Sequence, residues 1–175
     1  RLLKTAGLER DADKRVADYS KGMKSRLNFI KALLHDPVLL CLDEPTSGLD
    51  PVSRDELLHI FRCIVADGTR SILFSTHITT DLERIADKIV YIHDGSIAYD
   101  GDREKLTDTY CVVRGWHLPA EKRAHAIGLR QTDSGYECLM DLTHIGGLPS
   151  DTVTEKASIN DVIVYLERNA KSREV

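Results

Sequence analysis

The chain has 175 residues, of which 42% are hydrophobic and 30% are charged, and its formal net charge at pH 7 is −4. This composition supplies enough apolar side chains for a globular core, and the slightly acidic balance gives no general attraction to nucleic acid or anionic lipid. No apolar run approaches the roughly 20 residues that span a bilayer, so we expect that the chain does not cross a membrane unaided.

The first strongly periodic segment is a helix that follows Ser20. Its apolar positions recur at intervals of three and four residues, at Met23, Leu27, Ile30 and Leu34, and Pro37 ends it. Ahead of it, residues 2–8 predict a short surface helix.

The start of this helix, Tyr19-Ser20-Lys21-Gly22-Met23, allows two interpretations. Ser caps free N–H groups and Gly tolerates a turn in many proteins. Alternatively, the free N–H groups and the helix dipole bind a phosphate, which Gly allows close to the backbone. Nearby basic side chains favour an anion, although such a run is also typical of a solvated face: Lys21, Lys24, Arg26 and Lys31.

Residues 38–42 are five consecutive apolar residues, which predict a parallel strand buried on both faces. Asp43 and Glu44 follow directly, and Pro45 and Gly48 end the strand, so both acids should lie at the carboxyl edge where α/β sheets bind ligands. There Asp43 can hold Mg²⁺, directly or through water, and Glu44 can take a proton from an attacking water. The alternative is a strand with an ordinary polar exit.

A second helix and a second strand follow. Pro51 suits a first helical position, the apolar face from Leu57 to Val65 predicts a helix, and residues 71–75 predict a parallel strand. His77 then lies at the same rim as Asp43 and Glu44. A single His after a strand is otherwise commonly a loop residue.

The next segments predict a helix through residues 82–86, a hairpin with its turn at Asp94-Gly95, and a polar helix over 103–110. Beyond them we expect a strand at 111–114, a helix at 119–127, two strands within 128–141, and a last helix capped by Ser158. This region shows no catalytic pattern, and its scattered histidines do not indicate a metal site: His117, His125 and His144.

Four cysteines lie far apart without a C-x-x-C pair, which predicts buried structural thiols in a reducing compartment: Cys41, Cys63, Cys111 and Cys138.

Three strings together resemble one family. The apolar run at 38–42 with Asp43 and Glu44, continued by Pro45-Thr46-Ser47-Gly48-Leu49-Asp50, resembles the Walker B motif plus the D-loop of ATP-binding cassette (ABC) ATPases. Ser75-Thr76-His77 resembles their H-loop. Residues 19–23 resemble the signature motif LSGGQ. They depart from it at Tyr19, Lys21 and Met23, which puts the fine geometry and the turnover rate in doubt.

The resemblance implies a role for each matching residue. Ser20, Lys21, Gly22 and Met23 would bind an ATP held by the opposite subunit, with Ser20 and Gly22 at its γ-phosphate. Asp43 would hold Mg²⁺ through water, Glu44 would polarise the attacking water, His77 would orient that water and the γ-phosphate, and Asp50 would link the two sites of a dimer.

The fold class implied is α/β: a partial P-loop NTPase core in residues 1–110, with parallel strands and a C-terminal hairpin, plus a small α+β appendage in residues 111–175. The sequence contains no G-x-x-x-x-G-K-[ST] loop. We therefore expect a C-terminal part of a nucleotide-binding domain that alone neither holds ATP tightly nor hydrolyses it. The strand at 71–75 should also have an unpaired edge.

The implied function is that of the ATPase subunit of an ABC transporter, an exporter, which acts as a homo- or heterodimer on the cytoplasmic face of the membrane. It would reach the membrane only through a separate permease and would bind no nucleic acid. Two alternatives remain: a soluble ABC ATPase acting on DNA or ribosomes, and a non-enzymatic regulatory remnant. The sequence Thr46-Ser47-Gly48-Leu49-Asp50 and the lack of an extended basic stripe favour the ATPase subunit of a transporter.

Overall fold

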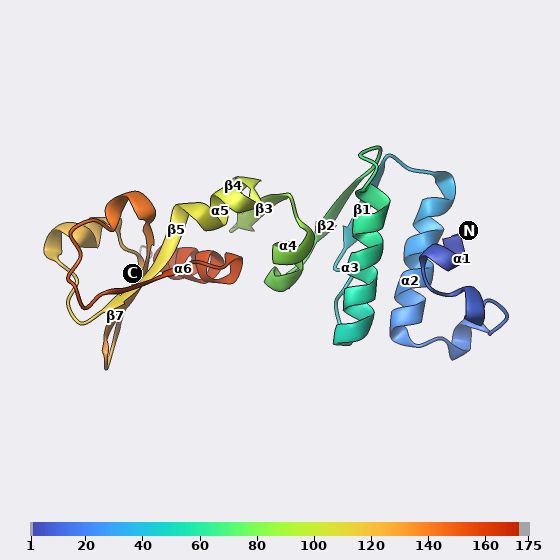
Figure 1. Ribbon diagram of the computed structural model, residues 1–175, viewed down its shortest axis with the longest axis horizontal. Coiled ribbons are helices and arrows are strands. Elements are labelled where there is room, and N and C mark those ends of the chain that lie inside the picture. The colour runs from blue at the N-terminus through green and yellow to red at the C-terminus, as the bar shows by residue number, and fades with distance from the viewer. Residues whose placement is uncertain (1, 172–175) are drawn as a thin grey trace. The chain divides into compact units, whose positions relative to one another are not determined.

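The computed structural model describes residues 2–171 (Figure 1). Its internal contacts divide the chain into two compact units, the first ending at Asp81 and the second beginning at Leu82. The domain boundary expected near residue 110 stays a prediction. None of the described helices is long and apolar enough to cross a membrane.

The first unit has two parallel strands and three α-helices. The strands β1 (Leu39–Asp43) and β2 (Ser71–Ser75) pair from Leu39 opposite Ser71 to Asp43 opposite Ser75. The helices are α1 (Leu2–Thr5), α2 (Lys21–Ala32) and α3 (Pro51–Val65), with short 3-10 turns at Glu9–Asp11, Val16–Asp18 and Leu33–His35. Because β1 and β2 are parallel and in register, the residues that follow them lie side by side.

Helix α3 contributes four buried apolar residues to the core of this unit. Asp50 caps it by accepting hydrogen bonds from the N–H groups of Val52 and Ser53, and Pro51 begins the first turn. Its buried face includes Phe61, whose ring centroid lies 4.8 Å from that of Phe29 on α2 and 6.2 Å from that of Phe74 on β2. These aromatic contacts pack both α2 and β2 against Phe61 of α3.

The expectation that β1 is buried on both faces is wrong. Leu40 is buried, but Leu39 is 54% exposed, and Leu73 on the same face of β2 is 60% exposed. The described first unit packs only one face of its two-stranded sheet, so alternate apolar residues face outward. Cys41 and, on α3, Cys63 are therefore exposed and not buried, whereas Cys111 and Cys138 are buried as expected. The outer edge of β2 is unpaired within the described residues, as predicted.

The second unit begins within α4 (Thr79–Ile85) and continues into the antiparallel hairpin of β3 (Lys88–His93) and β4 (Ser96–Asp102). Asp94 and Gly95 at its turn have φ values of 45° and 73°, as in the hairpin turn that this dipeptide predicts. Helix α5 (Arg103–Thr109) follows, also as predicted.

A four-stranded antiparallel sheet completes the second unit. Its order is β6-β7-β5-β8, with β5 at Tyr110–Gly115, β6 at Ile127–Thr132, β7 at Gly135–Asp141 and β8 at Val153–Lys156. Helix α6 (Ile159–Lys171) packs with Val112 and Leu139 on one face, and Val113, Cys138 and Met140 form a second cluster on the other. The predicted helix at 119–127 is instead a 3-10 segment, Ala120–His125, and a further 3-10 turn spans Leu142–His144.

Candidate functional site

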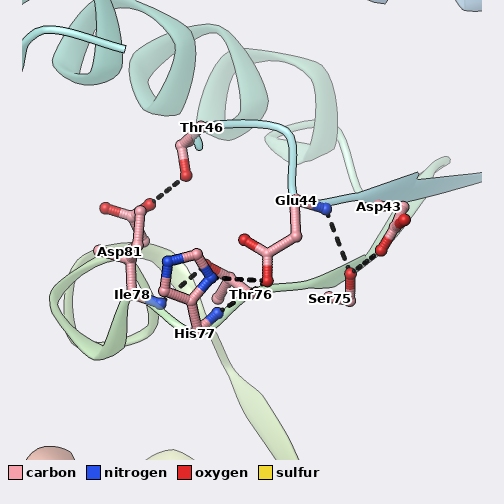
Figure 2. A network of polar contacts seen from close by, with 8 residues as sticks. All are labelled: Asp43, Glu44, Thr46, Ser75, Thr76, His77, Ile78 and Asp81. Carbon is pink, nitrogen blue, oxygen red and sulfur yellow. Dashed lines mark hydrogen bonds and ion pairs between the residues drawn. The ribbon is translucent and has the colours of Figure 1, made fainter. Parts of the chain in front are cut away.

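The carboxyl ends of β1 and β2 are tied together by Ser75. Its hydroxyl donates to Asp43 Oδ1 at 2.5 Å, and the Glu44 N–H lies 3.2 Å from Ser75 Oγ and 3.1 Å from the Ser75 carbonyl oxygen. Figure 2 shows Ser75 between the two acidic residues. The two strand ends therefore form one polar rim, as the sequence predicted.

Glu44 and His77 meet at this rim. Glu44 Oε1 accepts a hydrogen bond from the His77 N–H at 3.1 Å and lies 2.9 Å from His77 Nδ1 (Figure 2). Glu44 has a φ of 44°, the left-handed region that costs a non-glycine residue about 1–3 kcal/mol. Because this conformation turns the chain sharply after β1, the Glu44 side chain faces the loop that follows β2.

The second carboxylate oxygen of Glu44 differs from the first in its surroundings. Glu44 Oε2 is buried and has no hydrogen-bond partner within the described protein, although the side chain as a whole is 34% exposed. The neighbouring His77 side chain is 71% exposed. A carboxylate held beside an accessible imidazole is a candidate proton acceptor for a water molecule.

Asp43 is the candidate magnesium ligand. It is exposed, and Ser75 occupies one of its two carboxylate oxygens. The described residues contain no group of three or more His, Cys, Asp or Glu side chains that could hold a metal ion; His125 and His144 simply stack, with ring centroids 3.8 Å apart. Mg²⁺ is usually bound by one or two carboxylates together with the phosphates of a nucleotide, and the second carboxylate oxygen of Asp43 is the candidate for such a contact.

The start of α2 is packed against the loop after β1 and the start of α3. Ser20 is exposed and caps α2 by accepting the Met23 N–H at 3.2 Å. Gly22 is buried, and a Cβ there would lie 2.2 Å from Ser53 Oγ. The Lys21 ammonium group fills the space beside Gly48, where a Cβ would lie 2.1 Å from Nζ.

Parts of the chain are similar to a family model and to known ATP-binding proteins. Residues 8–80 match the family model described as an AAA domain, putative AbiEii toxin, Type IV TA system. The uncharacterized ABC transporter ATP-binding protein YxlF of Bacillus subtilis (strain 168) is 42% identical over 105 residues, covering 60% of this chain and 35% of that protein. The fluoroquinolones export ATP-binding protein of Mycobacterium tuberculosis (strain CDC 1551 / Oshkosh) is 39% identical over 142 residues, covering 80% and 45%.

The chain is also similar to a solved structure, that of CbiO1 of Clostridium perfringens, which is described as part of the ABC transporter complex CbiONQ. The TM-score is 0.56 and the sequence identity is 28%, and the match covers 60% of this chain and 42% of the CbiO1 chain. This chain carries part of an ABC ATPase core. The aligned part of this chain covers 35% to 45% of the length of these relatives.

Within this ABC ATPase core, the structure brings Asp43, Glu44 and His77 together at one rim. The described residues include no hydrogen bond or ion pair from Ser20 to any of these three. Asp50 is engaged as the cap of α3, and hydrogen bonds from Ser53 hold the pKa of its carboxyl below the ordinary value. The roles of Ser20, Lys21, Gly22, Met23 and Asp50 at a nucleotide stay predictions.

Sequence reasoning missed two features of this core. Ser75 was assigned to the second strand without a role, although its position opposite Asp43 could have been found from the parallel register. The packing of Gly22 on Ser53 could not be predicted from the sequence, because it depends on how closely two helices approach each other.

Proposed function

We propose that this chain supplies the signature helix, the Walker B carboxylates, the D-loop and the switch histidine of an ATP-hydrolysing subunit that powers an ABC exporter. The contact between Glu44 and His77 at the tips of two parallel strands carries this proposal, since it pairs a proton acceptor with a group that can hold a phosphate. The export function in the name of the mycobacterial relative supports the direction of transport.

In the proposed reaction Asp43 would hold Mg²⁺, and the ion would supply charge neutralisation at the phosphates. Glu44 accepts a proton from the attacking water, and its contact with His77 holds the carboxylate in place. When the His77 ring carries both protons, Nδ1–H donates to Glu44 and Nε2–H is left to donate to a phosphate oxygen or to the water.

The proposed assembly is a dimer on the cytoplasmic side of the membrane. ATP lies between a Walker A loop on one subunit and the α2 start of the other, where Ser20 and Gly22 present N–H groups and Lys21 adds positive charge. Asp50 links the two sites. A separate permease converts closure of the dimer into transport.

The experiment is a turnover assay with Mg-ATP. We expect the purified chain alone to show no turnover, and the chain mixed with a polypeptide bearing the Walker A half of an ABC ATPase to hydrolyse ATP. Clear turnover by the chain alone would overturn the need for a second segment. No turnover and no ATP binding in the mixture, with both components folded, would overturn the ATPase function.

A further inference from the structure

Beside the Glu44–His77 contact lie two buried polar side chains, Thr46 at 0% and Asp81 at 1% exposure (Figure 2). The Thr46 hydroxyl donates to Asp81 Oδ2 at 2.6 Å. Tyrosines and cysteines aside, these are the buried polar side chains of the described residues. Because a buried polar group without a hydrogen bond costs free energy, breaking this contact is unfavourable, and the contact restrains the two residues in the first unit.

The pair joins the two loops that carry the reactive groups. Thr46 lies two residues after Glu44, and Asp81 lies four residues after His77 in the first turns of α4. In Figure 2 the Thr46–Asp81 bond closes one side of the network, Ser75 closes the other, and the Glu44–His77 contact lies between them. Each loop is thus held at both ends.

Two further hydrogen bonds connect Asp81 to the backbone around His77. The Asp81 N–H bonds to the Ile78 carbonyl at 3.0 Å, and the Ile78 N–H bonds to Thr76 Oγ1 at 3.0 Å. The turn that presents His77 is therefore continuous with the start of α4. On the opposite loop, the left-handed Glu44 would relax to a commoner conformation without a restraint on the residues that follow it.

A role in packing alone does not account for this pair. Asp81 Oδ1 is buried and has no hydrogen-bond partner in the described part of the chain, so half of the carboxylate is desolvated without compensation. Replacing both members of such a pair by apolar groups of similar shape is often neutral or stabilising. A pair that an apolar contact could replace at no loss of stability is better explained by the position it imposes on its neighbours.

We propose that Thr46 and Asp81 form a positioning clamp that keeps Glu44 in its left-handed conformation and its Oε1 on His77. The significance of the clamp for ATP hydrolysis rests on the proposed function. The geometry that it imposes does not, because both loops and the clamp lie in this chain.

The test reads the His77 ring of the whole chain by ¹⁵N NMR without nucleotide, with His77→Gln to identify its signal. In the wild type we expect the neutral ring to carry its proton on Nδ1, as the contact with Glu44 requires. The double variant Thr46→Val/Asp81→Leu removes the clamp while leaving an apolar contact, and we expect it to lose this Nδ1–H signature and to shift the Glu44 backbone signal.

Two controls make the result specific. Thr69→Val removes another Thr–Asp hydrogen bond of the first unit, Thr69 Oγ1 to Asp67 Oδ1 at 2.7 Å, which is exposed, and should leave His77 unchanged. Thr46→Ser keeps the hydroxyl and should retain the wild-type signature. A folded double variant that keeps the Nδ1–H signature would overturn the clamp. So would a double variant that fails to fold, because the pair would then be a determinant of stability.

In the mixture that hydrolyses ATP, the double variant should lower kcat at least about tenfold and leave KM unchanged, since a small displacement of a catalytic group slows chemistry more than binding. An unchanged kcat would overturn the clamp's part in catalysis. If the folded wild-type mixture shows neither turnover nor ATP binding, the proposed function fails, and the NMR result still decides the clamp.

Discussion

Strands β1 and β5 both come from apolar runs, yet they end in different surroundings. In β5, Cys111, Val112 and Val113 are all buried, because clusters of side chains cover both faces of the four-stranded sheet. In β1 only Leu40 is buried. The sheet of the first unit thus contributes little to the core of that unit, whose buried residues lie mainly on its helices, and its strand ends carry polar contacts. Both faces of the four-stranded sheet in the second unit are covered by its core.

The largest expected effect is that of a charge placed in each sheet. Val113→Asp puts a carboxylate at a position with 0% exposure, which should cost several kcal/mol and unfold the second unit. Leu73→Asp, at 60% exposure in β2, should change the free energy of unfolding by less than about 0.5 kcal/mol. Denaturant titration of both variants measures the difference, and equal losses would contradict the comparison.

A methyl group added at two glycines gives the next largest effect. Gly22→Ala would bring Cβ within 2.2 Å of Ser53 Oγ, and the displacement of α2 from α3 should cost about 1–3 kcal/mol. Gly146→Ala, in the second unit, meets nothing within 4 Å and is the matched control. Thermal unfolding checks this. A Gly22→Ala variant as stable as the control would show that the close helix contact is absent.

The helix caps of the two units should differ more modestly. Ser158 accepts the Asp161 N–H at 3.1 Å, while its own N–H and hydroxyl donate to Asp161 Oδ2 at 3.0 and 2.6 Å. Ser20 makes the single cap bond to Met23. Ser158→Ala should therefore lose about 1–2 kcal/mol and Ser20→Ala about 1 kcal/mol or less, as measured by denaturant unfolding. The reverse order would be evidence against these capping geometries.

The smallest effects concern two carboxyl groups whose pKa values are lowered. For Asp141 the largest cause is the Thr143 hydroxyl, which Thr143→Val removes, so the pKa of Asp141 should rise towards its ordinary value. For Asp50 the largest cause is the Ser53 backbone N–H, which Ser53→Ala keeps, so its pKa should rise less. Carboxyl ¹³C NMR titrations measure both, and a larger shift at Asp50 would contradict this assignment of causes.

The sign of the linked stability follows from these directions. A carboxyl with a lowered pKa in the folded state stabilises the fold above its ordinary unfolded pKa, and that contribution is lost as the pH falls through the folded value. Each of the two substitutions should therefore make the chain slightly less stable at neutral pH and reduce its loss of stability on acidification.

Local signals in the sequence predicted most elements and the main site. Asp94-Gly95 determines its own turn, Pro51 begins one helix and Ser158 caps another, and two parallel strands place Glu44 and His77 at one edge. An apolar run, by contrast, does not reveal how many layers cover it, which is why the burial of β1 was predicted wrongly.

The missed features depend on contacts between distant segments. Strand β8 lacks apolar alternation and exists because it pairs with β5. The bond between Thr46 and Asp81 joins residues 35 positions apart, and neither residue type indicates such a partner from its own neighbourhood. Both contacts follow from the tertiary fold and not from local sequence.

The most direct measurement of the central claim is ATP turnover by the mixture described above, with wild-type chain, Glu44→Gln and the exposed control Glu104→Gln. Removal of a general base should lower kcat by about 10²–10⁴-fold in Glu44→Gln while ATP affinity is retained, and Glu104→Gln should match the wild type. Turnover that survives in Glu44→Gln, or that falls equally in both variants, would contradict the role given to the Glu44–His77 pair.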